Sequence, residues 1–460
     1  MGQETKAGSF GNVRKEKYAS VAYWITFYTY TFLIATRYFI YEEGYVSSAF
    51  SDVTLYQHVA LIASIIVGFA VLRKRDLTIP KRVLNVLATL ALLFGGIFPQ
   101  VRTNIYFCVG IAVLLGQLAT CSLLTYIYQM NNAERLFGIV GCHLLTAVVA
   151  VINVFFTRET AVFSWVIFGL AVCSATLCFL EKNNKPSASV VTEEFQKKLY
   201  IPLALACVGG FVSVCSSMIV IGKIAMTDSY ARLFYYGGAA LGAVVYYIVY
   251  RCWKKPASAT LIIGFSCSVV AIALYFFGGK TTGRTAAVFS GMTFNFCMMN
   301  LYYILCNIIK KYRNSNMLKT APILSNFVGC AITVLAVEAC KGASEETLKI
   351  ALMICIVGNV IILATSAFWQ KGLSLTAEEE QYVRYDTDLT RKQAYEAVGL
   401  TEKEMEVADM LAEGCSLKEI AKKSFVSENT AKTHRSAVYK KMGVSGREEL
   451  IEKVGNLRKE

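Results

Sequence analysis

The residues best suited to chemistry lie near the C-terminal end, where basic and hydroxyl side chains recur at helical spacing. Between residues 418 and 441 there are seven Lys or Arg against two Glu, an excess that suits contacts with phosphate groups. Within 428–441, five polar residues recur every three or four positions and therefore share one face of a helix. These residues are Asn429, Lys432, Thr433, Ser436 and Lys440. Such a face can hydrogen-bond to base edges and phosphates, so it indicates DNA binding.

The surrounding residues predict four short helices that position this face. Ser or Thr followed three residues later by Glu is the capping-box pattern of a helix start. It occurs at Thr401–Glu404, Ser416–Glu419 and Ser445–Glu448, and Ser427 offers a fourth N-cap without the reciprocal Glu. Gly414 and Gly443 fall where the first and third helices should end.

We therefore predict helices at about 402–413, 417–423, 428–441 and 446–454. The second and third form a helix-turn-helix, whose second helix enters the DNA major groove. Ala431 and Val438 are expected to face the domain core, with Met442 just beyond. Pattern alone leaves open a small helical domain that binds another protein instead of DNA.

Residues 400–454 closely resemble, without a gap, the DNA-binding domain of LuxR-type transcriptional regulators. The matching landmarks are Leu400, Thr401, Glu404, Glu406, Val407, Leu411, Ala412, Gly414, Ser416, Lys418, Glu419, Ile420, Ala421, Val426, Ser427, Asn429, Thr430, Lys432, Thr433, His434, Tyr439, Lys441, Gly443, Val444 and Arg447. Departures include Ser424 and Ala431, which shrink apolar positions, and Arg435, which takes a commonly aliphatic position and adds a candidate DNA contact.

The resemblance implies specific DNA contacts and partners. Lys432, Thr433 and Ser436 should reach base edges, and four more residues should lie along phosphates. Those four are Asn429, Thr430, Arg435 and Lys440. The family binds double-stranded promoter DNA as a dimer, often through the last helix, and RNA polymerase is a further candidate partner. The apolar candidates for pairing on that helix are Leu450, Ile451 and Val454.

The composition upstream is that of a membrane protein. The chain is 55% hydrophobic, only 17% of its residues are charged, and its mean hydropathy is +0.48. Between residues 18 and 369, twelve apolar runs are each long enough to cross a bilayer as a helix. They lie near 18–41, 55–72, 83–99, 104–128, 136–156, 161–180, 199–221, 233–251, 258–277, 286–309, 323–340 and 347–369. A soluble protein could not bury a dozen such helices, and residues 1–17 do not resemble a removable signal peptide.

Loop charges orient this bundle. Lys and Arg gather in alternate loops, which places the N-terminus and the C-terminus in the cytoplasm of a bacterial cell that has the bundle in its plasma membrane. The segment after residue 367 carries 16 Lys/Arg against 17 Asp/Glu, so the high pI reflects membrane orientation and not DNA binding. The polar break at 181–198 divides the spans into six and six, which resembles the major facilitator superfamily.

We thus predict an all-α, polytopic chain with a twelve-helix bundle and a four-helix DNA-binding domain. The predicted boundaries are an N-terminal segment at 1–17, a first six-helix half at 18–180, a linker at 181–198, a second half at 199–369, a juxtamembrane linker at 370–399 and the helix-turn-helix domain at 400–460.

Polar residues inside the spans are costly and are therefore candidates for function. In the superfamily that the layout resembles, the first, fourth, seventh and tenth spans line a central cavity. The resulting candidates for binding a small organic effector are Tyr28, Tyr30, Arg37, Gln117, Asn295 and Asn300. The many Tyr and Phe of the first span favour an aromatic effector. Snorkelling of Arg37 to the interface and hydrogen bonds between helices explain the same residues without a ligand.

Catalytic and metal-binding patterns are missing from the sequence. The 15 Cys are scattered, mostly singly in apolar runs and never as C-x-x-C, and only three His occur. We therefore expect no enzyme activity, no metal and no cofactor. The sequence predicts a membrane-integral, one-component transcription regulator that senses a small molecule. Two alternatives are a transporter that also regulates transcription and a DNA-binding tail that acts only as an anchor.

Overall fold

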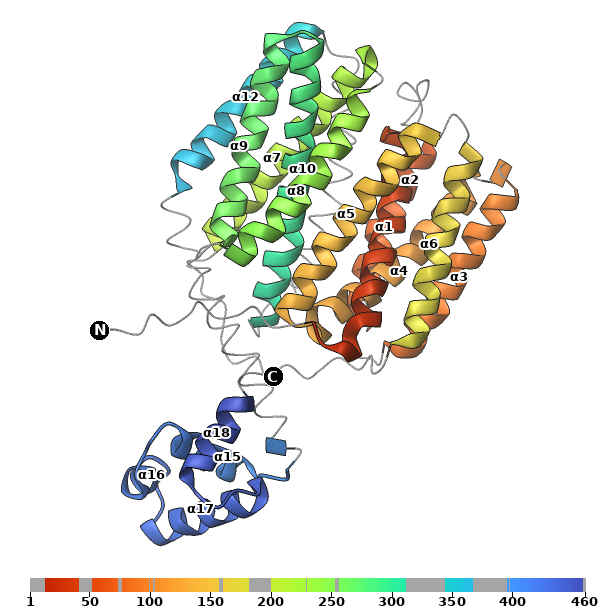
Figure 1. Cartoon of the computed structure of the whole chain (residues 1–460). Coiled ribbons are helices and arrows are strands. Elements are labelled where there is room, and N and C mark those ends of the chain that lie inside the picture. Colours follow the sequence, from red (N-terminus) through yellow and green to blue (C-terminus); the bar gives the residue numbers. More distant parts are fainter. Residues whose placement is uncertain are drawn as a thin grey trace. The chain divides into compact units, whose positions relative to one another are not determined.

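The computed structural model describes twelve stretches of the chain (Figure 1). They are 13–40, 52–72, 77–98, 100–101, 104–156, 160–181, 200–228, 230–252, 256–311, 344–366, 395–396 and 398–457. Within these stretches the regular elements are helices, and no strand occurs among them. The chain divides into two compact units, one over Ser9–Thr376 and the other containing Ala377–Glu460.

The larger unit begins with a short 3-10 helix, η1 (Lys15–Lys17), followed by long helices. These are α1 (Tyr18–Ile40), α2 (Asp52–Leu72), α3 (Thr78–Ile97), α4 (Ile105–Gln129), α5 (Asn132–Phe156), α6 (Thr160–Leu180), α7 (Tyr200–Thr227), α8 (Ala231–Cys252), α9 (Pro256–Phe277), α10 (Lys280–Lys311) and α12 (Glu345–Ala364). Eleven predicted spans thus coincide with described helices, whereas the span predicted at 323–340 lies outside the described residues.

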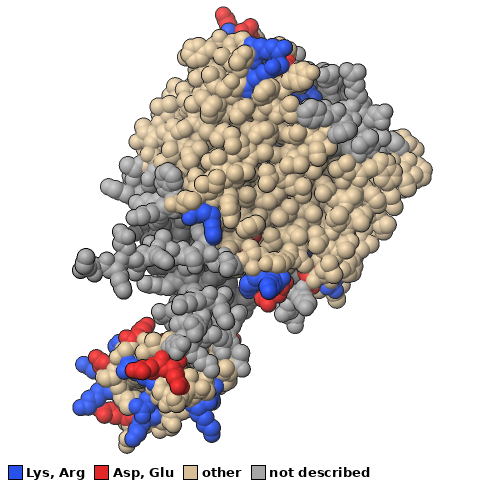
Figure 2. All heavy atoms as spheres, viewed as in Figure 1, with Lys and Arg blue, Asp and Glu red and all other residues tan. Residues whose placement is uncertain are grey.

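Seven of these helices are long and apolar enough, by length and composition, to cross a membrane: α3, α4, α5, α7, α8, α9 and α12. Charged side chains gather near the two ends of this unit on the face drawn in Figure 2, and an uncharged band separates them. Helices α1–α6 lie together, and α7–α10 lie together with α12; α5 lies beside α8 (Figure 1). The predicted linkers fall largely on residues 182–199 and 367–394, so their boundaries stay predictions.

Small residues permit the closest helix pairs of the unit. An added Cβ at Gly116 of α4 would lie 2.7 Å from the Cβ of Ser64 on α2. At Gly291 of α10, an added Cβ would collide with the carbonyl oxygen of Tyr235 on α8. Small residues that let backbones approach are the usual device for packing helices in lipid, where no hydrophobic effect drives them together.

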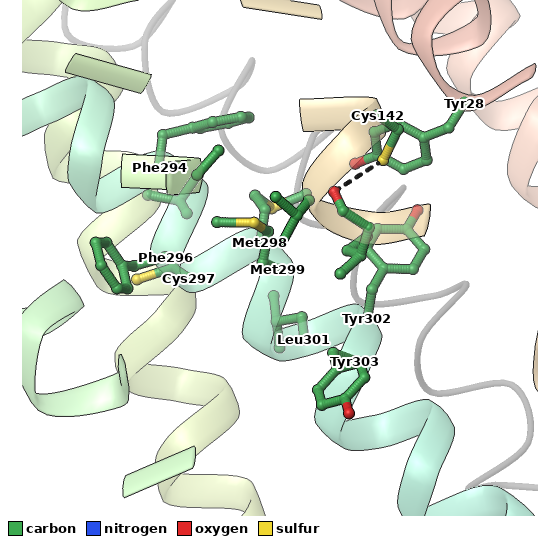
Figure 3. Close-up of a cluster of buried hydrophobic side chains, with 14 of the residues drawn as sticks. Tyr28, Cys142, Phe294, Phe296, Cys297, Met298, Met299, Leu301, Tyr302 and Tyr303 are labelled. Carbon is green, nitrogen blue, oxygen red and sulfur yellow. Dashed lines mark hydrogen bonds between the residues drawn. The ribbon is translucent and has the colours of Figure 1, made fainter. Parts of the chain in front are cut away.

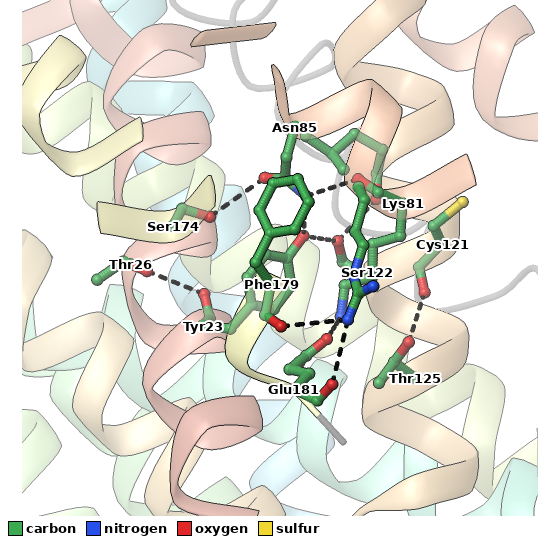
Figure 4. A network of polar contacts seen from close by, with 12 residues as sticks. Tyr23, Thr26, Lys81, Asn85, Cys121, Ser122, Thr125, Ser174, Phe179 and Glu181 are labelled. Carbon is green, nitrogen blue, oxygen red and sulfur yellow. Dashed lines mark hydrogen bonds and ion pairs between the residues drawn. The ribbon is translucent and has the colours of Figure 1, made fainter. Parts of the chain in front are cut away.

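A buried ion pair lies at the centre of a polar network that joins four of the first six helices. Lys81 Nζ on α3 lies 2.7 Å from Glu181 Oε2 at the end of α6, and both side chains are fully buried (Figure 4). The same ammonium lies 3.8 Å above the ring of Tyr23 on α1. Asn85 donates to the Tyr23 hydroxyl (3.2 Å), and that hydroxyl is 2.6 Å from Ser122 Oγ on α4. One polar network therefore connects α1, α3, α4 and α6.

The smaller unit contains the four predicted short helices. They are α15 (Glu402–Ala412), α16 (Leu417–Lys423), α17 (Glu428–Met442) and α18 (Arg447–Leu457). Both predicted glycine stops have positive φ, 95° at Gly414 and 62° at Gly443. The capping boxes at Thr401–Glu404 and Ser416–Glu419 are confirmed. The third box is wrong: α18 begins one residue later than predicted, so Glu449, not Glu448, accepts from the Ser445 N–H at 2.7 Å.

Candidate nucleic-acid interface and candidate effector site

Helix α17 presents one polar face, as its spacing predicts. Ser427 caps its start by accepting from the Thr430 N–H at 3.1 Å. The opposite face is anchored by Ala431, Val438 and Met442, which are buried in the domain core. The predicted DNA-binding residues on the free face are exposed: Asn429, Thr430, Lys432, Thr433, Ser436 and Lys440. Arg435 is half-buried, with its guanidinium 5.9 Å from the centre of the Tyr439 ring.

Contacts distant in sequence hold α17 against the other helices. Lys441 Nζ, in the last turn of α17, lies 2.7 Å from Glu404 Oε2 at the start of α15. The same carboxylate accepts from the Thr401 N–H at 2.7 Å. The hydrogen bond from Lys441, reinforced by that from Thr401, holds the pKa of Glu404 below its ordinary value. Lys441 is therefore engaged within the domain, although the sequence counts it among the basic residues suited to phosphates.

The turn between α16 and α17 contains an exposed aromatic residue that the sequence analysis did not predict. Phe425 has a φ of 51° and is 95% exposed. A non-glycine residue with positive φ is uncommon, and a large aromatic side chain is normally buried. Neighbouring Val426 donates its N–H to the Ala421 carbonyl at 3.0 Å, which closes the turn around Phe425.

In the larger unit, polar side chains meet where helices α1 and α5 pack against α8 and α10. The His143 Nδ1 atom of α5 lies 2.9 Å from Asn295 Oδ1 of α10. Asn295 Nδ2 donates to the Ala239 carbonyl of α8 at 2.5 Å. Because that bond uses the amide nitrogen, Asn295 presents its oxygen to His143, and Nδ1 must carry the proton. His143 Nε2 is then free to accept from the Tyr28 hydroxyl of α1 at 3.3 Å.

Aromatic rings and apolar side chains surround this polar centre. The ring of Tyr302 on α10 lies 5.3 Å from that of Tyr28 and 6.3 Å from that of Trp24, edge to face in both cases. Phe294 lies 5.6 Å from Phe32 of α1. Figure 3 shows the row of α10 side chains, from Phe294 to Tyr303, that includes the ring facing Tyr28. We call Trp24, Tyr28, His143, Asn295 and Tyr302 the inter-half site.

Comparison with known proteins decides the family. Residues 398–454 match the model of the family described as bacterial regulatory proteins, luxR family. The spore germination protein GerE of Bacillus subtilis is 40% identical over 52 residues, which are 11% of this chain and 70% of GerE. The chain belongs to the luxR family of bacterial regulatory proteins. The helix-turn-helix prediction is thereby confirmed, and the domain is one that binds DNA.

Other similarities extend less far. An HTH-type transcriptional regulator of Mycobacterium bovis is 34% identical over 85 residues, 18% of this chain and 10% of the regulator. The match with this chain thus covers about a tenth of the length of that relative. A crystal structure of the nucleoside transporter NupG aligns with a TM-score of 0.50 and 8% identity, over 77% of this chain and 99% of NupG. That likeness concerns the fold alone, and together with the apolar helices it indicates a membrane protein.

Of the five predicted effector residues whose side chains the structure describes, two come together. Tyr28 and Asn295 meet through His143, which the sequence did not single out as an effector residue. Tyr30 is buried and packs on Phe27 of its own helix, with ring centroids 5.7 Å apart. The side chain of Arg37 lies outside the described residues.

Each of the other two candidates bonds to neighbouring helices of its own half. Gln117 donates to the Ser64 carbonyl of α2 at 2.7 Å. Asn300 Oδ1 accepts from Tyr246 at 3.2 Å and from Thr260 at 2.8 Å, on α8 and α9. Both residues thus form hydrogen bonds between helices, which explains their presence in the spans without a ligand.

The last helix differs from the prediction in its exposed face. Leu450 and Val454 are buried in the domain core, so they are not free apolar candidates for pairing two copies. Ile451 is 43% exposed and keeps that role as a candidate. The prediction took three apolar residues at helical spacing for one exposed stripe, but this helix must contribute two of them to a core of only four short helices.

Proposed function

We propose that this protein is a membrane-integral, one-component transcription regulator. Its α17 face reads promoter DNA, and its helix bundle senses a small molecule. The observation that carries the proposal is that a luxR-family DNA-binding domain and an apolar bundle of transporter-like fold belong to one chain. A signal received by the bundle needs no second protein to reach the DNA-binding domain.

The DNA contacts follow from exposure and side-chain length. Lys432, Thr433 and Ser436 project from the face of α17 opposite to Ala431 and Val438, so they reach base edges when α17 enters the major groove. Asn429, Thr430, Arg435 and Lys440 contact flanking phosphates. Two copies of the domain bind the two halves of an operator, with Ile451 as a candidate contact between them.

The cytoplasm is the compartment in which such a domain meets DNA, and we propose that both chain termini lie there. Loop charges support this orientation. Near the N-terminal end of α1, Arg14 Nε pairs with Glu134 Oε1 at 2.9 Å, and Lys81 pairs with Glu181. Their helix ends would face the cytoplasm. The Arg284–Asp228 pair, with Nε and Oδ2 2.7 Å apart, would mark the opposite end.

Sensing requires that the effector bind one arrangement of the bundle more tightly than another. The inter-half site is the proposed place, because its side chains come from α1, α5 and α10 and its Asn295 also bonds to the α8 backbone, so it links helices of both halves. A molecule bound there would have to replace contacts that now join the halves. The resulting movement would reach the DNA-binding domain through the chain that follows α12.

Purified full-length protein in lipid nanodiscs tests the DNA-binding part of the proposal. Operator sequences are first selected from a random DNA pool with the wild type. Lys432→Ala should then lose preference for the selected operators over other DNA. Lys403→Ala should retain that preference, because Lys403 is exposed on α15 and pairs with Glu406 at 3.1 Å. Unchanged selection by Lys432→Ala would contradict the proposal.

A second candidate function is transport combined with regulation, which the fold likeness to a transporter favours. Uptake of radiolabelled compounds into vesicles containing the purified protein distinguishes it from sensing alone. Sensing alone predicts saturable binding without accumulation inside the vesicles.

A further inference from the structure

The indole nitrogen of Trp24 is a buried donor without an acceptor in the part of the chain that the structure describes. Trp24 is 2% exposed, and its Nε1 has no hydrogen-bond partner among the described residues. Buried N–H groups are nearly always satisfied, because desolvating a donor without a partner is costly. An unused donor inside the inter-half site therefore points to an acceptor supplied from outside the chain.

Flat aromatic surfaces surround this donor. The Trp24 ring stacks on Tyr126 of α4, with centroids 4.2 Å apart, and lies 6.0 Å from the ring of Tyr28. An added Cβ at Gly138 of α5 would lie 3.0 Å from Trp24 Cδ1, so a larger residue at this position would press on the indole. Rings that lie face to face or edge to face favour a planar aromatic guest.

The site contains no charge. Every described buried charged residue of the larger unit lies at or near a helix end: Lys81, Glu134, Arg135, Glu181 and Asp228. The hydrogen-bonding groups around the centre are a hydroxyl, an amide, an indole and an imidazole whose Nδ1 donates and whose Nε2 accepts. A charged guest would lose its hydration without gaining a counter-charge, which strongly disfavours it.

We propose that the inter-half site binds an uncharged, planar aromatic compound whose acceptor atom accepts a hydrogen bond from Trp24 Nε1–H and whose ring lies against Tyr28 and Tyr302. This inference rests on the proposed sensing function and names its class of effector. Insertion of the ring would part Tyr28 from Tyr302, and hence α1 from α10.

The test uses ring compounds that share one shape and differ in charge. Benzamide is uncharged, benzoate is an anion and benzamidine is a cation at neutral pH; nicotinamide and nicotinate form a second series. Each is titrated into full-length protein in nanodiscs while the thermal unfolding midpoint and the tryptophan fluorescence are followed. We expect saturable binding of the amides and at least tenfold weaker binding of the ions.

Matched variants locate the binding. Trp24→Phe keeps an aromatic ring but removes the donor together with part of the indole, so it should weaken amide binding at least about tenfold, the effect of one hydrogen bond. Trp165→Phe alters an indole that is largely exposed on α6 and should leave binding unchanged. Gly138→Ala should also weaken binding, whereas Gly169→Ala, with open space around the added Cβ, should not. Thermal unfolding shows whether each variant is folded.

The outcomes separate this inference from the proposed function. Absence of amide binding, equal binding of amides and ions, or unchanged binding by folded Trp24→Phe and Gly138→Ala would each overturn the inference. Binding to the selected operators, measured on the same samples, would then still support the proposed function as a transcription regulator. Amide binding that depends on Trp24 but leaves DNA affinity unaltered would uphold the site and refute sensing.

Discussion

Lys441 and Glu404 are 37 residues apart, yet they form a 2.7 Å ion pair that joins the end of α17 to the start of α15. Glu404 is buried, and its carboxylate also completes the capping box of Thr401. One side chain thus serves the local helix start and the packing of the helix that contacts DNA.

Glu404→Gln should destabilise the DNA-binding domain by about 1–3 kcal/mol, because it removes the charge that two donors now share. Hydrogen–deuterium exchange of the full-length protein should show faster exchange in both α15 and α17. Glu406→Gln is the control, since Glu406 pairs only with exposed Lys403 on its own helix. Faster exchange confined to α15 would mean that the Lys441 contact contributes nothing.

The same carboxylate should make the stability of the domain depend on pH. The pKa of Glu404 is lowered from 4.5 on folding, chiefly by Lys441 and then by Thr401, so the unfolded chain binds its proton more readily. Its stabilising contribution is complete above pH 4.5 and is lost as the pH falls below that value. Protection from hydrogen exchange should fall less steeply with decreasing pH in Glu404→Gln than in the wild type. Parallel pH profiles of the two proteins would exclude this role.

Lys432 and Lys440 should differ in what they contribute to DNA binding. Lys432→Ala should relax base preference at one operator position, with a loss of about 1–3 kcal/mol of discrimination. Lys440→Ala should weaken binding to all sequences alike and reduce the salt-dependence slope by about one. Fluorescence anisotropy at several salt concentrations, on selected and scrambled duplexes, distinguishes the two. An equal loss of affinity for selected and scrambled duplexes in Lys432→Ala would show instead that Lys432 contacts phosphates.

The buried Lys81–Glu181 pair should be sensitive to the loss of either partner. Lys81→Met leaves an uncompensated carboxylate in a fully buried position, which should cost about 3–5 kcal/mol. The double variant Lys81→Met with Glu181→Leu should recover most of that loss, because no buried charge remains. Lys349→Met is the matched control: Lys349 is half exposed and pairs with exposed Glu345, so its loss should cost far less than the loss of Lys81. Thermal unfolding in nanodiscs compares the four proteins.

Local sequence patterns determined the elements of this protein. A capping box joins residues three positions apart, so Thr401–Glu404 and Ser416–Glu419 are visible without a fold. Apolar runs long enough for a bilayer likewise predicted eleven of the described helices. The spacing of three to four residues placed the exposed face of α17 correctly, because that face depends only on the helical period.

Only the tertiary structure decided which distant residues meet. Tyr28, His143 and Asn295 come from three helices, 115 and 152 residues apart, and no local pattern marks His143 as their link. Asn300 lies on the same helix as Asn295 but bonds to α8 and α9, since a helix turns by about 100° at each residue. Leu450 and Val454 are buried for a similar reason: spacing shows that a helix has an apolar stripe, but the neighbouring helices decide which surface covers it.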